Sequence, residues 1–246
     1  MSEREGDGGS VRIMTWNIHG AFGRNPRFDL ARVAALIRRW DPDVVALQEV
    51  DSRRALADAT DPFEFLTGAV GLYGIGAKSL NSEDGDYGQM LISRWPLENH
   101  EICDISFPER EPRRAIRADV ATPAGSLTVI ATHLGLSIRE RHSQALVLTK
   151  LAAGEGPTVI AGDFNDWFWP GSVRAVLSRV LGGRTRARTF PSRCPLFRFD
   201  RIYCRPREAL VRSFVDREAR ALSDHLPVIA DVRIAPPPRR QPSNPA

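Results

Sequence analysis

The chain has 246 residues, of which 42% are hydrophobic and 26% are charged. That composition is ordinary for a globular domain and excludes a disordered or collagen-like chain. No apolar run approaches the roughly 20 residues that span a bilayer, and the polar start of the chain lacks the apolar core of a signal peptide. The three cysteines suit neither a disulfide framework nor a zinc site, so we expect a cytoplasmic protein without a transmembrane segment.

The positive charge is concentrated in one part of the chain. The formal net charge is +4, yet residues 171–220 hold 13 arginines and only four acidic residues. A basic segment on a slightly acidic body suits an anionic partner such as a phosphate ester. A solvated arginine-rich surface accounts equally well for the same composition, so both interpretations stay open.

Apolar patterns predict one domain over 11–234, between a disordered tail at 1–10 and a Pro/Arg-rich tail at 235–246. In chain order, a strand at 11–16 precedes a helix that Asp29 caps and whose apolar residues share one face. The following elements are expected to be strands at 44–47, 89–93, 117–121 and 127–132, a helix at 140–153, and a strand at 158–161. A helix from Ser172 to Val180 and strands at 197–204, 210–214 and 227–234 complete the chain. This many strands predicts an α/β fold in which two packed sheets are flanked by helices.

Polar side chains stand at the ends of five predicted strands. They are Asn17, Glu49, His133, the Asp163–Asn165 segment and the Asp224–His225 pair. Polar groups at the carboxyl ends of strands in α/β sheets commonly face a binding crevice. A single such residue is often only where the chain meets water, but five in register predict a functional site.

The residue types are chemically coherent. Asn17, Glu49 and Asp224 offer hard oxygen ligands, which suit Mg²⁺ or Mn²⁺ rather than zinc. Asp200 interrupts an apolar strand, and a buried carboxylate needs a partner such as the N–H of His225. The alternative partners of Asp200 are the neighbouring arginines on its own strand, which point to the opposite face.

Asp163 and Asn165 alternate along an extended segment and so face the same way. An acid and an amide placed in this way can orient a water molecule and hold a phosphoryl oxygen, although an Asp/Asn turn would use the same residues.

Seven segments, in this order over residues 11–234, resemble the endonuclease/exonuclease/phosphatase superfamily, which has the DNase I-like fold. They are Thr15–His19, Leu47–Val50, Tyr87–Arg94, Ala131–Leu134, Ala161–Asn165, Phe199–Tyr203 and Leu222–Pro227. The resemblance implies a four-layer α/β sandwich with two mixed sheets and a metal-dependent phosphoesterase site.

Carried over by position, the resemblance implies that Glu49 is the main metal ligand, with Asn17 and Asp224 completing the site. It implies that His225 is the catalytic histidine and that Asp200 orients it. It further implies that Asp163 positions or deprotonates the attacking water, and that Asn165 and His133 donate to the phosphate.

Several residues near this site are candidate substrate contacts. Arg113 and Arg114 precede a predicted strand, and either could meet a phosphate group or form a solvated pair. Arg201 stands in an Asp-Arg-Ile sequence that also resembles inositol polyphosphate 5-phosphatases, in which the arginine lies near phosphate. Among Trp167, Phe168 and Trp169, an aromatic ring could stack on a base or cover a lipid chain, while Phe168 is expected in the core. His19, His100 and His142 are interpreted as surface or ordinary packing residues.

The sequence thus predicts a divalent-metal-dependent enzyme that hydrolyses a phosphodiester or phosphomonoester by direct attack of water. Within that class, a DNA or RNA nuclease and a phospholipid or inositol-phosphate hydrolase stay open. A non-catalytic binding module is a weaker alternative, because every role that the chemistry requires has a residue. A peripheral membrane protein is another, supported only by the arginine-rich segment.

Overall fold

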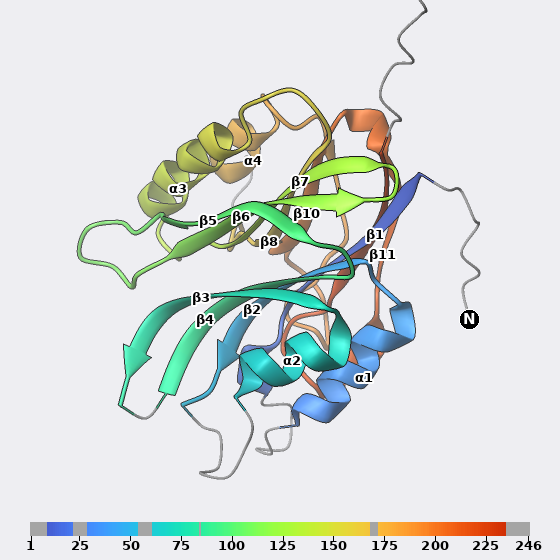
Figure 1. Ribbon diagram of the computed structural model, residues 1–246. Coiled ribbons are helices and arrows are strands. Elements are labelled where there is room, and N and C mark those ends of the chain that lie inside the picture. Colours follow the sequence, from blue (N-terminus) through green and yellow to red (C-terminus); the bar gives the residue numbers. More distant parts are fainter. Residues whose placement is uncertain (1–8, 22–28, 54–60, 84, 168–171, 235–246) are drawn as a thin grey trace, which may run out of the picture.

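Two six-stranded sheets pack face to face with helices on both outer faces, which confirms the predicted four-layer α/β sandwich (Figure 1). The computed structural model describes residues 9–21, 29–53, 61–83, 85–167 and 172–234. Most residues of the two predicted tails lie outside these ranges. Phe168, which was expected in the core, also lies outside them. None of the helices in the described ranges combines the length and the apolar character needed to cross a membrane.

The first sheet has the strand order β11-β12-β1-β2-β4-β3. Its strands are β1 (Ser10–Asn17), β2 (Val44–Asp51), β3 (Tyr73–Ser82), β4 (Gly85–Ser93), β11 (Leu210–Val215) and β12 (Val228–Arg233). Its outer face carries helices α1 (Leu30–Trp40) and α2 (Pro62–Val70). The predicted cap of α1 is confirmed, since the Asp29 side chain accepts a hydrogen bond from the backbone N–H of Arg32.

The second sheet has the strand order β5-β6-β7-β8-β10-β9. Its strands are β5 (Leu97–Asp104), β6 (Arg114–Thr122), β7 (Gly125–His133), β8 (Thr158–Asp163), β9 (Gly183–Arg184) and β10 (Asp200–Arg205). Helices α3 (Ile138–Leu151) and α4 (Ser172–Leu177) cover its outer face. The remaining elements are the short 3₁₀ helices η1 (His19–Ala21), η2 (Arg207–Ala209) and η3 (Arg217–Ala221).

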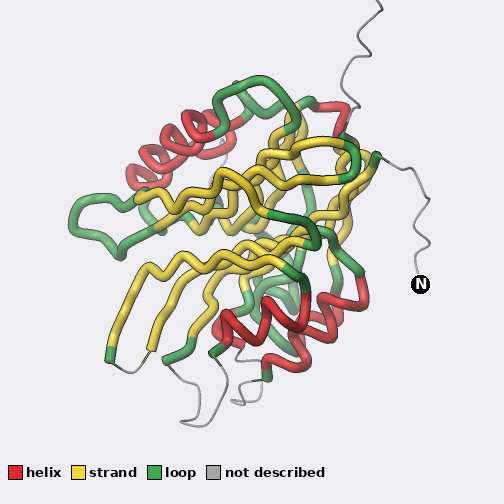
Figure 2. Tube along the Cα trace, in the orientation of Figure 1, coloured by secondary structure: helices red, strands yellow, loops and turns green. Residues whose placement is uncertain are grey.

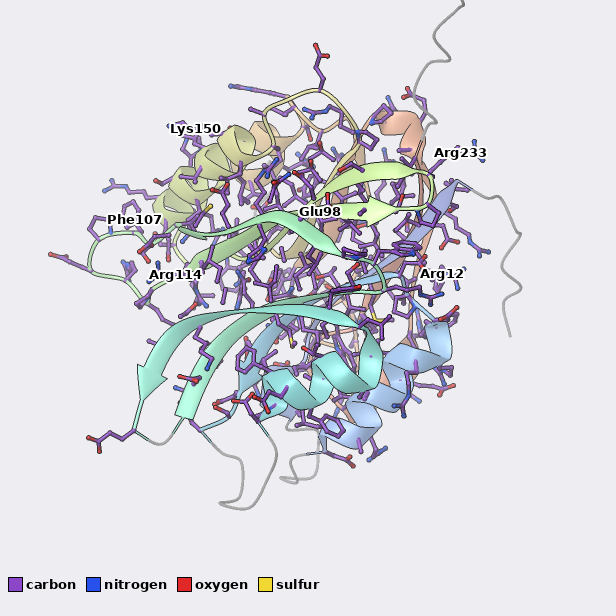
Figure 3. All side chains as sticks on the ribbon, in the orientation of Figure 1. Arg12, Glu98, Phe107, Arg114, Lys150 and Arg233 are labelled. Carbon is purple, nitrogen blue, oxygen red and sulfur yellow. The ribbon has the colours of Figure 1, made fainter. Side chains whose placement is uncertain are left out.

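Three apolar layers hold the sandwich together. The inner faces of both sheets meet in a central layer that includes Ile13, Val129 and Ile202. A second layer joins the first sheet to α1 and α2, and a third joins the second sheet to α3 and α4. Side chains fill the space between the sheets throughout (Figure 3). Since apolar residues on both faces of a strand are buried, the central strands read as continuous apolar runs in the sequence.

Some predicted boundaries were wrong. The strand expected at 197–204 begins only at Asp200, because Phe197 instead forms an isolated antiparallel bridge with Phe190. The helix expected at 140–153 starts earlier, where Ser137 and Glu140 form a capping box. The helix expected to reach Val180 ends at Leu177. Strands β3, β5 and β9 and helix α2 were not predicted.

Each sheet contains one parallel pair, and each pair presents its carboxyl ends at the same end of the sandwich. Strands β1 and β2 are parallel and joined through α1, while β7 and β8 are parallel and joined through α3. The remaining neighbours are antiparallel, so both sheets are mixed. Figure 2 shows the strands of both sheets lying between the helices of the two outer faces. The ends of β1 and β8 meet, since Asn17 lies 3.1 Å from Asp163. The fold therefore collects polar residues from distant parts of the sequence at one edge.

Candidate active site

Asn17 and Glu49 come from the ends of the parallel strands β1 and β2. The pairing of β2 with β4 shifts register between Gln48 and Val50, so Glu49 bulges out of the ladder with a φ of 57°. This backbone is uncommon for a residue with a side chain, and bulges often re-aim one next to a site. The Nδ2 group of Asn17 donates to Oε1 of Glu49 at 2.8 Å and lies 3.1 Å from Oδ2 of Asp163.

His133 and Asp163 end the parallel strands β7 and β8 and are register partners. Nε2 of His133 lies 3.6 Å from Oδ2 of Asp163. The backbone N–H of Asn165 donates to Oδ1 of Asp163 at 2.9 Å, and the Asn165 side-chain amide donates to the backbone oxygen of Leu134 at 2.9 Å. All three side chains are buried, so their positions are set by hydrogen bonds rather than by water.

Asp200 begins β10 opposite Asp163 and holds His225. Nδ1 of His225 donates to Oδ2 of Asp200 at 2.8 Å, and Nε2 of His225 lies 3.8 Å from Oδ2 of Asp163. Asp200 has therefore taken the histidine partner that the sequence predicted, rather than a neighbouring arginine. The three residues form a buried group in which one ligand atom of each lies within 4.8 Å of the others.

The loop that carries His225 is fixed from two sides. Trp16 donates from its indole nitrogen to the backbone oxygen of His225 at 3.0 Å. The hydroxyl of Ser223 donates to the backbone oxygen of Asn17 at 2.7 Å and accepts the N–H of His225 at 3.1 Å. The ring of Phe190 packs against the imidazole, with centroids 4.8 Å apart. These contacts pre-organise the imidazole before any substrate binds.

The two buried histidines differ in protonation. Burial lowers the pKa of His225, but the charges of Asp200 and Asp163 outweigh it and raise that pKa to about 10. Burial lowers the pKa of His133 to about 3, and the charge of Arg113 acts in the same direction. His225 is therefore a cation at neutral pH, while His133 is neutral.

The tautomer of His133 follows from its neighbour. Nη1 of Arg113 lies 3.3 Å from Nδ1 of His133, and a guanidinium can only donate. Nδ1 is therefore the acceptor, and the proton of the neutral ring sits on Nε2, 3.6 Å from Oδ2 of Asp163. The amide nitrogen of Asn165 lies 3.4 Å from Nε2, but it already donates to the backbone oxygen of Leu134 at 2.9 Å, so it does not need Nε2 as an acceptor.

The two carboxylates of the site also differ. Burial raises the pKa of Asp163, and the positive charge of His225 only partly offsets it. Burial raises the pKa of Glu49 as well, but the hydrogen bonds from His19 and Asn17 lower it to about 2. Glu49 is thus a permanent anion, whereas Asp163 has the stronger affinity for a proton.

Asp224 and His19 lie on the solvent side of this cluster. Nδ1 of His19 is 3.5 Å from Oε2 of Glu49 and 3.6 Å from Oδ1 of Asp224. His19 is exposed, as expected for a surface residue, but its ring also lies between two of the predicted metal ligands, a position that the sequence did not predict. Its spacing of two residues from Asn17 was the signal that could have indicated this. His100 and His142 are exposed, as expected.

The candidate substrate contacts flank the cluster on two sides. Arg113 is buried against His133, while Arg114 forms an ion pair with Asp104 at 2.9 Å at the end of the sandwich opposite Arg12 (Figure 3). Arg201 and Trp167 lie on the other side, where both line a cavity. Trp167 is 47% exposed, which leaves its ring accessible.

Two groups of side chains are candidates for holding a divalent cation, and they differ in donor atoms and in exposure. In the buried group, Asp200 and His225 are already hydrogen-bonded to each other, and all three side chains are nearly inaccessible. Magnesium keeps several water ligands and so needs open space. The side chains of Glu49 and Asp224 are 23% and 44% exposed and converge on one point, now occupied by the His19 nitrogen. These hard oxygen donors fit a hydrated divalent ion better than the buried group does.

A family model described as "Endonuclease/Exonuclease/phosphatase family" matches residues 14–225. The chain therefore belongs to this family, and the resemblance seen in the sequence is confirmed. Members of the family are phosphoester hydrolases, so the protein is a hydrolase that acts on phosphate ester bonds. The family is generally dependent on divalent metals.

The chain is 32% identical to the protein named "Uncharacterized protein YbhP" of Escherichia coli, over 92% of this chain and 97% of that protein. It is 28% identical to exodeoxyribonuclease III of Haemophilus influenzae over 49% of this chain and 40% of that enzyme. The crystal structure of an endonuclease/exonuclease/phosphatase from Beutenbergia cavernae has a TM-score of 0.75 at 23% identity, covering 92% of this chain and 72% of that chain. A mannosyl-6-phosphatase of Bacteroides thetaiotaomicron has a TM-score of 0.66 at 18% identity, covering 89% and 98%.

Proposed function

We propose that the protein is a cytoplasmic, Mg²⁺- or Mn²⁺-dependent phosphoesterase that hydrolyses its substrate by direct attack of water. The observation that carries the proposal is the convergence of the Asp200–His225 pair, Asp163 and the Glu49–Asn17 pair in one cluster. Phosphoryl transfer requires mainly positioning and charge stabilisation, and this cluster supplies both. Family membership supports the reaction class.

Glu49, Asp224 and Asn17 would hold the divalent ion, with Glu49 as the main ligand. When bound, such an ion neutralises charge on the phosphoryl group or the leaving group. Asn17 connects this part of the site to the chemistry, since its amide contacts both Glu49 and Asp163. Replacement of Asn17 should therefore disturb both the metal-binding and the water-binding sides.

His225 serves as a fixed cation next to the phosphoryl oxygens. Its Nδ1–H is held by Asp200, which leaves Nε2–H to donate to a phosphoryl oxygen that gains charge in the transition state. The role of Asp200 in this scheme is to orient the imidazole ring of His225 and to stabilise its protonated form.

Asp163 accepts the proton of the attacking water. Its raised pKa makes it a better base than an ordinary carboxylate, and the N–H of Asn165 fixes its second oxygen. The Nε2–H of His133 and the amide of Asn165 are placed to donate to the phosphate from the same side. Water is thus oriented and deprotonated by groups whose geometry exists before substrate binds.

The substrate is either a phosphodiester or a phosphomonoester. Among similar proteins, one is named an exodeoxyribonuclease and another a mannosyl-6-phosphatase, so both bond types occur. Arg114 is proposed as a substrate contact on the His133 side, and Arg201 and Trp167 on the other. A nucleic acid, a phospholipid headgroup or an inositol phosphate would each meet these residues.

The test is a substrate panel with Mn²⁺ that contains bis-p-nitrophenyl phosphate, p-nitrophenyl phosphate, plasmid DNA, phospholipid and inositol phosphates. We expect hydrolysis of at least one class, abolished by EDTA. His225→Ala should lower the rate by roughly 10²-fold or more, in line with the loss of a transition-state donor. The matched control is His142→Ala, an exposed histidine away from the cluster. Wild-type turnover by His225→Ala, or no turnover of any substrate, would refute the proposal, and the latter would favour a binding module.

A further inference from the structure

A second concave site lies near the catalytic cluster, at the edge of the second sheet. It has a volume of about 340 Å³, and its lining comes from the loop after β8, from α4, and from the chain around β9 and β10. The polar lining is dominated by five arginines with a single acid. We call this concave site the arginine pocket. Its charged residues are Arg174, Arg184, Arg186, Arg198, Arg201 and Asp166.

Several of these arginines are hydrogen-bonded to neutral oxygens. Arg184 donates to the hydroxyl of Ser178 at 3.1 Å, and Arg198 donates to the backbone oxygen of Arg186 at 2.7 Å. Arg201 donates to a backbone oxygen and to a tyrosine hydroxyl, and its nitrogen is 4.0 Å from the carboxylate of Asp166. The lining therefore carries five guanidinium groups and one carboxylate, so its formal charge is strongly positive.

Three of the five arginines are at least partly buried, whereas Arg186 and Arg198 are exposed. Arg201 is 8% exposed and Arg184 is half-buried. Burial lowers the pKa of Arg184, and the like charges of Arg174, Arg186 and Arg201 lower it further. Holding like charges together away from water is costly unless an anion binds among them. A fully solvated arginine-rich face, which the sequence left open, would not bury Arg201 or hold Arg174 and Arg184 partly out of water.

The pocket adjoins the catalytic cluster but is distinct from it. Arg201 directly follows Asp200 on β10, and neighbouring strand residues point to opposite faces. The ring of Phe199 lies 5.6 Å from the ring of Trp167, which lines the pocket, and 6.1 Å from the ring of His225. One aromatic side chain therefore separates the catalytic imidazole from the wall of the arginine pocket.

We propose that the arginine pocket binds a second phosphate group of the substrate, one that is not cleaved, so that the natural substrate carries at least two phosphate groups. This inference rests on the proposed function. Guanidinium groups bind phosphate through paired N–H donors, and the pocket presents them from several sides. Trp167 and Phe197 add an apolar wall that suits the ring joining the two phosphates. A nucleotide and a phosphorylated cyclitol share this chemistry.

The first test compares substrates that differ by one phosphate. The nucleotide arm uses p-nitrophenyl thymidine 5′-phosphate with and without a 3′-phosphate, and the cyclitol arm uses inositol 1-phosphate and inositol 1,4-bisphosphate. In the arm that corresponds to the natural substrate, we expect KM to be about tenfold lower or more when the second phosphate is present. Equal KM values in both arms would overturn the inference.

The second test removes the pocket charge. Arg184→Gln combined with Arg186→Gln should raise KM for the two-phosphate substrate by about tenfold or more while kcat is retained. The matched control is Arg188→Gln combined with Arg193→Gln, two exposed arginines outside the pocket lining with the same change in charge. Thermal unfolding of both double variants checks that they fold. An equal rise in KM in the control variant would show that KM depends on the net charge of the protein rather than on binding in the arginine pocket. That result would also overturn the inference.

A binding measurement separates this inference from the proposed function. Titration calorimetry in EDTA, with thymidine 3′,5′-bisphosphate and inositol 1,4-bisphosphate as probes, needs no catalysis. Binding of one probe that the pocket variant weakens and the control does not supports the pocket, even if no ester in the panel is hydrolysed. Binding of neither probe, or undiminished binding by the pocket variant, refutes the pocket even if the enzyme is active.

Discussion

Replacement of Asp200 by Asn removes a negative charge from the partner of His225 while keeping an acceptor oxygen in place. The bond concerned is 2.8 Å long, and both side chains are buried. A hydrogen bond to a charged group contributes about 1.5–3 kcal/mol, and each 1.36 kcal/mol corresponds to a factor of about ten in rate. Because we propose that the Asp200 charge acts on His225 mainly in the transition state, kcat should fall by about 10- to 100-fold with little change in KM.

The assay is the initial rate of p-nitrophenol release from bis-p-nitrophenyl phosphate with saturating Mn²⁺, together with thermal unfolding. Asp119→Asn is the matched control, since Asp119 also accepts a hydrogen bond on the second sheet, from Thr128 at 2.8 Å, but away from the cluster. The control should keep the wild-type kcat. A folded Asp200→Asn enzyme with wild-type kcat would refute the argument that Asp200 supports His225.

Three further predictions test other parts of the structure. Glu49→Gln should raise the Mn²⁺ concentration for half-maximal activity by about tenfold or more, and an unchanged metal titration would contradict its role as the main ligand. Arg113→Met, which takes away the donor to Nδ1 of His133, should lower kcat/KM by about tenfold, whereas the exposed Arg110→Met should not. Burial raises the pKa of Asp231, but the hydrogen bonds from Arg12 and Arg212 outweigh burial and lower this pKa below its ordinary value. The ionised carboxylate therefore stabilises the fold above the unfolded pKa of about 4, and this stabilisation is lost as pH falls through the folded pKa. Asp231→Asn should therefore lower the free energy of unfolding by about 2 kcal/mol at pH 7 and by less at pH of about 3, and an equal loss at both pH values in urea unfolding would contradict the reasoning.

The sequence by itself determined the elements whose apolar pattern is strong. The strand at the start of the chain, the helix capped by Asp29 and the strands at 44–47, 127–132 and 158–161 are all recognisable from apolar patterns in the local sequence, although their parallel pairing is not. Asn17, Glu49, His133 and Asp163 could be selected because each stands at a strand end, and strand ends are visible in the chain. Strands such as β5, which is largely exposed, carry no such pattern and were missed.

Only the tertiary structure decided which of these residues meet and which others join them. Asp200 and His225 are 25 residues apart, Asn17 and Asp163 are 146 apart, and no local pattern sets such distances. His19 reaches the carboxylates because its backbone adopts a φ of 49° after β1, which its neighbours in sequence do not dictate. The arginine pocket likewise exists only because three segments fold together, since the composition of residues 171–220 was equally compatible with a solvated face. Local side-chain chemistry specifies secondary structure and residue type, whereas long-range packing specifies charge, burial and protonation.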